Sequence, residues 1–273
     1  MTTDLNEKLD RLTTILAGLA INGRFAIAYS GGLDSRFLAH AANLANLEPE
    51  LLHAHGPHIA SGENRYARDW AIKNRMQLHI LQADPLTVPE VAANDRMRCY
   101  HCKKALFSRL LAEAKGLPLG DGTQASDSGT YRPGRAALQE LGIRSPLAEA
   151  GLAKSEIRLL AAKTGMDNPG QKARPCLLTR FAYQLSPDRA SLAALDKAEQ
   201  RIESALHRFY PCSIDSELPD FRLRHLAGGE MELHLTPLSG TSDTLPDKLE
   251  ASLRQAVRGA TGKEPSAIRE MPQ

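Results

Sequence analysis

The sequence predicts an α/β fold, in which a parallel sheet carries helices on both faces, followed by a smaller α+β unit. Short apolar runs alternate with helical patterns over residues 24–164, which is typical of a parallel sheet. A glycine turn joins the first run to a helix. After about residue 186 a long helix, a hairpin and a final helix replace this alternation. We therefore expect a first domain at residues 1–170 and a second at 186–265.

Hydrophobic spacing defines the elements of the first domain. An opening helix is predicted by apolar residues at helical intervals, namely Leu5, Leu9, Leu12, Leu16 and Leu19, and Gly23 follows it. Further helices are expected at 34–45, 62–76, 102–115, 135–141 and 155–164. Short apolar runs at 24–29, 50–55, 77–83 and 117–121 are expected to be strands.

The second domain is expected to contain helices at 190–209 and 245–259 and a hairpin of strands 221–226 and 231–236. The tail from residue 262 is expected to be mobile. If Gly228-Gly229 forms the turn, Arg222 and Arg224 share a face with Leu233 and Leu235. That face is either a pocket for an anion or an edge strand covered by long side chains.

Composition gives no electrostatic argument for a nucleic-acid or membrane partner. The chain has 273 residues, 42% of them hydrophobic, so it can form a core, and its 34 basic and 32 acidic residues leave a net charge of +2. This near neutrality favours neither nucleic-acid nor membrane binding. The polar start MTTDLNEKLD and the lack of an apolar run of ~20 residues predict a cytoplasmic protein. An anionic ligand must then be held by a local site.

The six residues Ser30 to Ser35 form a candidate phosphate site, because S-G-G-L-D-S ends a strand and opens a helix. Gly31 and Gly32 let the backbone approach a phosphate closely, and Ser30 and Ser35 add hydroxyl donors. Asp34 would repel phosphate unless a cation such as Mg²⁺ intervenes, or it caps the helix. We expect Arg36 to add positive charge nearby. The alternative is a plain glycine turn.

A second segment follows the strand at 117–121. Gly122 and Thr123 are placed to meet an α-phosphate or a carboxylate, and Asp127 to hold the cation. A plain turn explains any one of these residues equally well.

The cysteines predict a metal centre. Cys99 and Cys102 form a C-x-x-C motif at a helix start beside cationic residues, which favours thiolates, and Cys176 is the candidate third ligand. Three thiols on a [4Fe-4S] cluster leave one iron open to hold a sulfide. The alternatives are a zinc site that includes His101, whose spacing is poor, or a buried core thiol at Cys176. Cys212 is interpreted as structural.

The Ser30 loop lacks the Gly-Lys-Ser/Thr of a Walker A motif and resembles the pyrophosphate loop (PP-loop) of the N-type ATP pyrophosphatases. With the runs at 95–107, 121–138, 144–158 and 175–181, it resembles the LarE sulfur transferases over about residues 5–235. The resemblance implies that ATP adenylates a carboxylate of a pyridinium-3,5-dicarboxylate mononucleotide and releases pyrophosphate. Sulfur then displaces AMP and leaves a thiocarboxylate, a step in making the nickel-pincer nucleotide cofactor of lactate racemase.

The resemblance also implies roles for individual residues and a homo-oligomer acting on a small molecule. Residues 30–35 match the ATP loop, and Gly122, Thr123 and Asp127 match a second nucleotide segment. Four residues match positions near the reacting centre, namely Asp34, Cys176, Arg180 and Glu199. Arg222 and Arg224 match an arginine pair that binds the substrate phosphate. Cys99, Cys102 and Cys176 match the three-cysteine, four-iron subtype, while a second subtype sacrifices one cysteine. The sequence departs from the pattern at Arg36, Gln124 and Thr130.

Three other functions remain open. A tRNA thiolase would use the same loop and similar cysteines, but it would need a basic surface. An amide ligase would use ammonia and would not need the cysteines. A regulator that binds nucleotide or zinc without catalysis would release no pyrophosphate.

Overall fold

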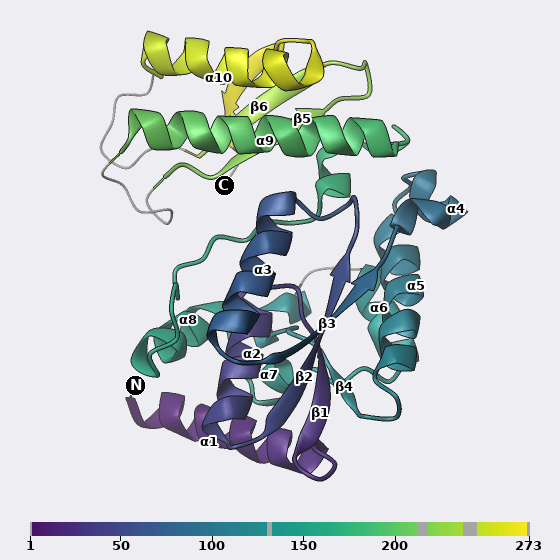
Figure 1. Ribbon diagram of the computed structural model, residues 1–273, viewed down its shortest axis with the longest axis vertical. Helices are drawn as coiled ribbons and strands as arrows, with labels where there is room; N and C mark the ends of the chain where they lie inside the picture. Colours follow the sequence, from purple (N-terminus) through teal and green to yellow (C-terminus); the bar gives the residue numbers. More distant parts are fainter. Residues whose placement is uncertain (1, 130–132, 212–217, 237–244, 272–273) are drawn as a thin grey trace.

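A four-stranded parallel sheet forms the centre of the first part of the chain, so the predicted α/β class is confirmed. The computed structural model describes residues 2–129, 133–211, 218–236 and 245–271 (Figure 1). The strands are β1 (Arg24–Ala28), β2 (Glu48–His55), β3 (Gln77–Gln82) and β4 (Leu119–Gly120), in the order β3-β2-β1-β4. The carboxyl ends of all four therefore meet at one edge, and the order reverses between β1 and β4, where such sheets bind ligands.

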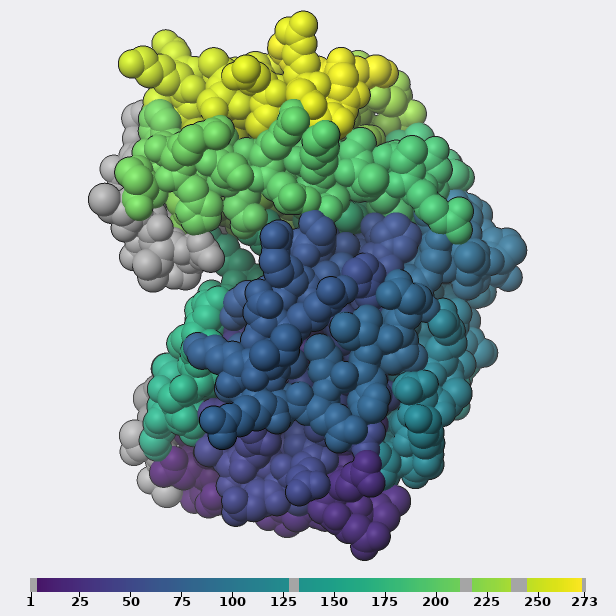
Figure 2. Space-filling model, in the orientation of Figure 1, coloured from purple at the N-terminus to yellow at the C-terminus, as the bar shows by residue number. Residues whose placement is uncertain are grey.

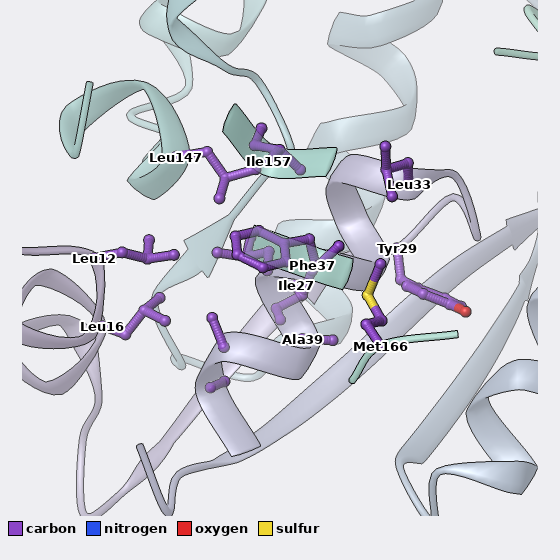
Figure 3. Packing of buried hydrophobic residues seen from close by; sticks show 14 of the residues in the cluster. Leu12, Leu16, Ile27, Tyr29, Leu33, Phe37, Ala39, Leu147, Ile157 and Met166 are labelled. Carbon is purple, nitrogen blue, oxygen red and sulfur yellow. The ribbon is translucent and has the colours of Figure 1, made fainter. Parts of the chain in front are cut away.

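Helices cover both faces of this sheet. α1 (Thr2–Leu19), α2 (Leu33–Leu44) and α3 (Ser61–Lys73) lie on one side, and α5 (Arg98–Glu113) and α6 (Pro133–Glu140) lie on the other (Figure 1). Along β1, Phe25 and Ile27 join the core under α1 and α2, whereas Ala26 joins the core under α5. Figure 3 shows Leu12 and Leu16 of α1 with Ile27 and Phe37 in the first of these cores. Short elements complete this part: η1 (Pro85–Thr87), α4 (Pro89–Ala92), η2 (Ala125–Gly129), α7 (Pro146–Glu149), α8 (Lys154–Lys163) and η3 (Leu177–Arg180).

The second part has its own sheet and its own core. α9 (Arg189–Phe209) and α10 (Asp247–Thr261) pack side by side (Figures 1 and 2). They share a core with a sheet in the order β5-β6-β7. β5 (Phe221–His225) and β6 (Met231–Leu235) form the predicted hairpin. β7 (Ala267–Glu270) pairs in parallel with β6, so the prediction that the whole tail is mobile was wrong. The backbone of β7 forms its strand hydrogen bonds with the edge of β6 that does not face β5.

The predicted register of the hairpin was also wrong by one residue. Arg222 lies opposite His234 and Arg224 opposite Glu232, while Leu233 faces Leu223 on the buried side. The Leu226 N–H donates to the Glu230 carbonyl at 2.9 Å, so three residues make the turn rather than two. One extra residue moves every side chain of a strand to the other face. The arginines therefore lie on the polar face of the hairpin.

Candidate active site

The Ser30–Ser35 loop lies at the carboxyl end of β1 and is closed by its own hydroxyl groups. The Gly32 N–H donates to Ser30 Oγ at 3.3 Å, Ser35 Oγ donates to the Gly32 carbonyl at 3.1 Å, and the two hydroxyl oxygens are 3.2 Å apart. Gly31 has φ +80°, and a Cβ there would lie 2.4 Å from the Ala67 Cβ of α3. Only glycine fits this position, because both the backbone angle and the space exclude a side chain.

The second predicted segment meets this loop directly. A Cβ on Gly122 would lie 3.0 Å from the Ser35 nitrogen and 3.3 Å from Asp34, so the backbone after β4 packs against the start of α2. Thr123 Oγ1 donates to Asp121 Oδ2 at 2.5 Å, and Ser145 Oγ donates to Asp121 Oδ1 at 2.7 Å. The structure thus brings the two segments together where the strand order reverses.

A lysine that the sequence interpretation missed lies at the same place. Lys154 Nζ, at the start of α8, donates to both carboxylate oxygens of Asp34 at 2.8 Å. The pKa of Asp34 is raised, because burial outweighs the lowering effect of Lys154. The charge of Asp127 adds to the increase. The N-cap of α2 is Gly32, with no side-chain bond, so Asp34 does not cap this helix. A lysine in the first turn of a helix is unfavourable with the helix dipole, and this is the feature of the sequence from which a role for Lys154 could have been predicted.

Arg36 does not face the phosphate site, which corrects the expectation that it adds charge there. Its side chain is fully buried and donates to the carbonyls of Asp167 and Asn168 at 2.9 and 3.0 Å and to Gln171 Oε1. The guanidinium also lies 5.2 Å from the Tyr66 ring centre. Arg36 therefore ties α2 to the segment at residues 167–171.

The structure brings the three predicted thiols close enough to influence one another's pKa. Cys99 and Cys102 lie in the first turns of α5, and Cys176 caps η3; all three are free. Burial, then the charges of Cys176 and Cys99, raise the pKa of Cys102 to about 12. Burial and Cys99 also raise the pKa of Cys176, and Arg98 opposes this only in part. The expectation that the surroundings favour thiolates was therefore wrong for Cys102 and Cys176, because burial outweighs the nearby cations. Cys212 and Thr130 lie outside the described residues.

The thiols form no single-ion site with the side chains that the structure describes. Within the described ranges, no three His, Cys, Asp or Glu side chains converge closely enough to hold an ion, and His101 completes no such set. Zinc requires sulfur ligands at about 2.3 Å from one centre. In a four-iron cluster each cysteine binds a different iron, so the thiols stay further apart. A four-iron cluster on these three cysteines stays a prediction.

Three arginines gather beyond η3. Arg180 Nε donates to Glu199 Oε1 at 2.7 Å, and both side chains are buried. Arg180 Nη1 donates to Thr179 Oγ1 at 3.1 Å and Arg224 Nη1 to the carbonyl of the same residue at 3.3 Å, so these two guanidinium groups lie close together. Burial, then Arg222 and Arg180, lower the pKa of Arg224. Within the described part of the chain, the Nε atoms of Arg222 and Arg224 have no hydrogen-bond partner. This surplus of cationic donors suits an anion.

Short contacts connect the thiols to the arginines. Arg98 Nη1 of α5 donates to the Leu178 carbonyl at 2.8 Å, which fixes η3 beside the C-x-x-C motif. Thr179 Oγ1 donates to the Cys176 carbonyl at 2.7 Å, and Arg224 Nη1 donates to the Thr179 carbonyl at 3.3 Å. η3 therefore carries Cys176 at one end and Arg180 at the other.

Two cavities lie at the edge formed by the strand ends. The larger, about 310 Å³, is bounded by the residues after β2 and by α9, and includes His55, Asn64 and Asp196. No site residue predicted from the sequence lines it. The smaller, about 100 Å³, has His58 and Cys102 in its wall. Space near the thiols is thus present but small.

Among the helices of the described residues, none is both long and apolar enough to cross a membrane.

Comparison with known proteins identifies three relatives, while no protein-family model matches the chain. The uncharacterized protein slr1717 of Synechocystis sp. is 33% identical over 66% of this chain and 67% of its own length. The uncharacterized protein MJ0830 of Methanocaldococcus jannaschii is 30% identical over 71% and 75%. The pyridinium-3,5-bisthiocarboxylic acid mononucleotide synthase of Lactiplantibacillus plantarum is 28% identical over 77% and 80%.

Proposed function

The chain belongs to the LarE-like family of these relatives, and on that premise we propose that it is an ATP-dependent sulfur transferase. ATP adenylates a carboxylate of a pyridinium-3,5-dicarboxylate mononucleotide and pyrophosphate leaves. Sulfur then displaces AMP to give a thiocarboxylate. The Lactiplantibacillus plantarum relative is named as a synthase of a bisthiocarboxylic acid mononucleotide, which supports this substrate class.

One observation carries the proposal: a group of free thiols and a group of arginines are joined through η3. Cys176 and Arg180 lie at the two ends of this short helix, beside Cys102 and Arg224 respectively. An enzyme that transfers sulfur to an anionic substrate needs a sulfur site next to an anion site. A ligase using ammonia would need only the second.

ATP is assigned to the Ser30–Ser35 loop. Amides at the start of α2 and the hydroxyls of Ser30 and Ser35 would hold the outer phosphates, which leaves the α-phosphate open to attack. Asp34 and Asp127 supply the oxygen ligands that Mg²⁺ prefers. Lys154 lies where it can neutralise phosphate charge once the cation takes its place at Asp34.

The sulfur carrier is assigned to Cys99, Cys102 and Cys176. Their chemistry fits a [4Fe-4S] cluster, which would supply an exchangeable sulfide on its fourth iron. The protein's own contribution is to fix the thiols, because Arg98 holds η3 against α5. Arg222 and Arg224 would bind the substrate phosphate, and their Nε atoms, which have no partner among the described residues, are donors for it.

The reaction is tested with purified protein, MgATP and the pyridinium dicarboxylate mononucleotide. We expect release of pyrophosphate that depends on this acceptor and a product mass in which sulfur replaces oxygen. Total tRNA and ammonia serve as alternative acceptors. Pyrophosphate release with tRNA or ammonia, and none with the mononucleotide, would contradict the proposal.

The sulfur source is tested by purification without oxygen, iron and sulfide analysis, and absorption spectroscopy. We expect iron in the wild type and in Ser108→Ala, an exposed control on α5, and loss of the cluster in Cys176→Ala. A colourless protein whose Cys176 becomes dehydroalanine after one turnover would instead show that this cysteine is sacrificed.

A further inference from the structure

Gln171 joins the buried Arg36 to the phosphate loop. Its Oε1 accepts from Arg36 Nε at 3.1 Å and from Nη2 at 2.7 Å, and its Nε2 donates to the Gly31 carbonyl at 3.2 Å. Gln171 lies 135 residues from Arg36 in the sequence, in the segment that leads to Cys176. One amide therefore connects α2, this segment and the loop.

The orientation of this amide is determined by Arg36. A guanidinium has only donors, so the oxygen of Gln171 must face it and the NH₂ group must face the loop. The guanidinium itself is fixed by the carbonyls of Asp167 and Asn168 and by the rings of Tyr66 and Trp70. Because Arg36 is fully buried, it cannot turn to solvent for other partners.

This bond fixes one peptide plane of the loop. In a trans peptide the carbonyl and the following N–H point in opposite directions, so holding the Gly31 carbonyl outward directs the Gly32 N–H inward. The Gly32 N–H indeed faces the inside of the loop, 3.3 Å from Ser30 Oγ. Gly31 and Gly32 lack side chains that would otherwise limit rotation of this peptide, so it is held by hydrogen bonds on its two sides, from Gln171 Nε2 to the Gly31 carbonyl and from the Gly32 N–H to Ser30 Oγ.

We propose that Arg36 and Gln171 are positioning residues that hold the Gly31–Gly32 peptide with its N–H directed at the anion site. The proposal rests on the proposed function only in identifying the anion as a phosphate of ATP. Neither side chain touches the anion. They act on anion binding through the Gly31–Gly32 peptide, whose N–H contacts the anion.

The test is Gln171→Glu, which separates positioning from stability. A glutamate keeps an acceptor for Arg36 and places its charge beside the buried guanidinium, so the variant should still fold, which its melting temperature checks. It cannot donate to the Gly31 carbonyl, and its second oxygen repels that carbonyl. We expect a Kd for inorganic pyrophosphate and for ATP about tenfold weaker, the effect of one lost donor in the loop.

Gln255→Glu, at an exposed position of α10, controls for the added negative charge. The ¹⁵N–¹H resonance of Gly32 provides a readout without any ligand. It should move in Gln171→Glu and stay in Gln255→Glu. If Gln171→Glu does not fold, Gln171→Met removes the same donor and should move the same resonance.

An unmoved Gly32 resonance in the folded variant overturns the inference, and so does unchanged pyrophosphate affinity. If the wild type binds neither pyrophosphate nor ATP, the proposed function fails instead, while the Gly32 resonance still decides whether Gln171 holds this peptide.

Discussion

Lys154 donates to both carboxylate oxygens of Asp34 at 2.8 Å, across 120 residues of sequence. Each residue opens a helix, α8 and α2 respectively, and the second nucleotide segment lies beside them because the Lys154 N–H donates to Ser126 Oγ at 3.2 Å. The ammonium group of Lys154 therefore compensates the charge of Asp34 at this loop before any phosphate binds. The pair therefore joins the Ser30–Ser35 loop to the start of α8, beside the second nucleotide segment.

Lys154→Met should reduce ATP use without unfolding the protein. The variant removes the positive charge beside the loop and leaves Asp34 to repel phosphate, so we expect acceptor-dependent pyrophosphate release to fall by about tenfold or more. Steady-state kinetics with varied MgATP measures this. Lys248→Met, at an exposed position of α10, should behave as wild type. Equal rates in both variants would show that Lys154 serves only to hold α8.

Arg180→Met should destabilise the fold strongly. The variant leaves Glu199 buried without its ion partner, and breaking a buried pair costs about 3–5 kcal/mol. Arg258→Met removes an exposed pair with Glu264 and should cost about 1 kcal/mol or less. Urea unfolding compares the two.

The double variant Arg180→Met with Glu199→Leu separates stability from chemistry. It should recover most of the lost stability, because no unpaired charge remains. If it also recovers sulfur transfer, the predicted place of Arg180 and Glu199 near the reacting centre is wrong.

The sequence predicted those parts of the fold that depend on local patterns. Alternating apolar runs and helical spacing indicated the parallel sheet, and S-G-G-L-D-S indicated the turn at its first strand. Polarity and short length concealed β7, which exists only through its pairing with β6. The hairpin register failed by one residue because turn length could not be read from Gly228-Gly229 alone.

The missed residues of the site are those whose partners lie far away in sequence. Arg36 follows the loop directly, so a basic residue there suggested phosphate, yet its side chain turns to residues 167–171. Gln171 has no local pattern at all. Contacts that span more than 100 residues depend on how helices pack, and a single sequence does not show this.

Arg224→Met should weaken binding of the phosphorylated substrate rather than of ATP. Arg224 lies on the polar face of the hairpin beside Arg222 and Arg180, and its Nε is an unpartnered donor within the described part of the chain. One lost charged hydrogen bond corresponds to about a tenfold rise in KM for the mononucleotide. The same measurement with the dephosphorylated nucleoside should give no difference between variant and wild type. A rise in KM for both acceptors would place the phosphate elsewhere.

His40 should make the fold less stable in acid. Its Nε2 lies 3.0 Å from Thr164 Oγ1, whose own proton is donated to the Leu160 carbonyl, so His40 is the donor in this bond. Burial lowers the pKa of His40 below its ordinary 6.5, against smaller opposing effects of Thr164 and Asp167. Below pH 6.5 the unfolded chain therefore binds a proton that the folded chain does not, and the free energy of unfolding falls as the pH falls.

His40→Gln keeps a donor for Thr164 but does not titrate. We expect its free energy of unfolding to match the wild type at about pH 7.5 and to exceed it at about pH 5.5. Urea unfolding at both values measures the difference. The slope with pH should decrease and not vanish, because burial also lowers the pKa of His55, His58 and His225. An identical slope in variant and wild type would mean that His40 gains a proton as readily in the folded protein as in the unfolded chain.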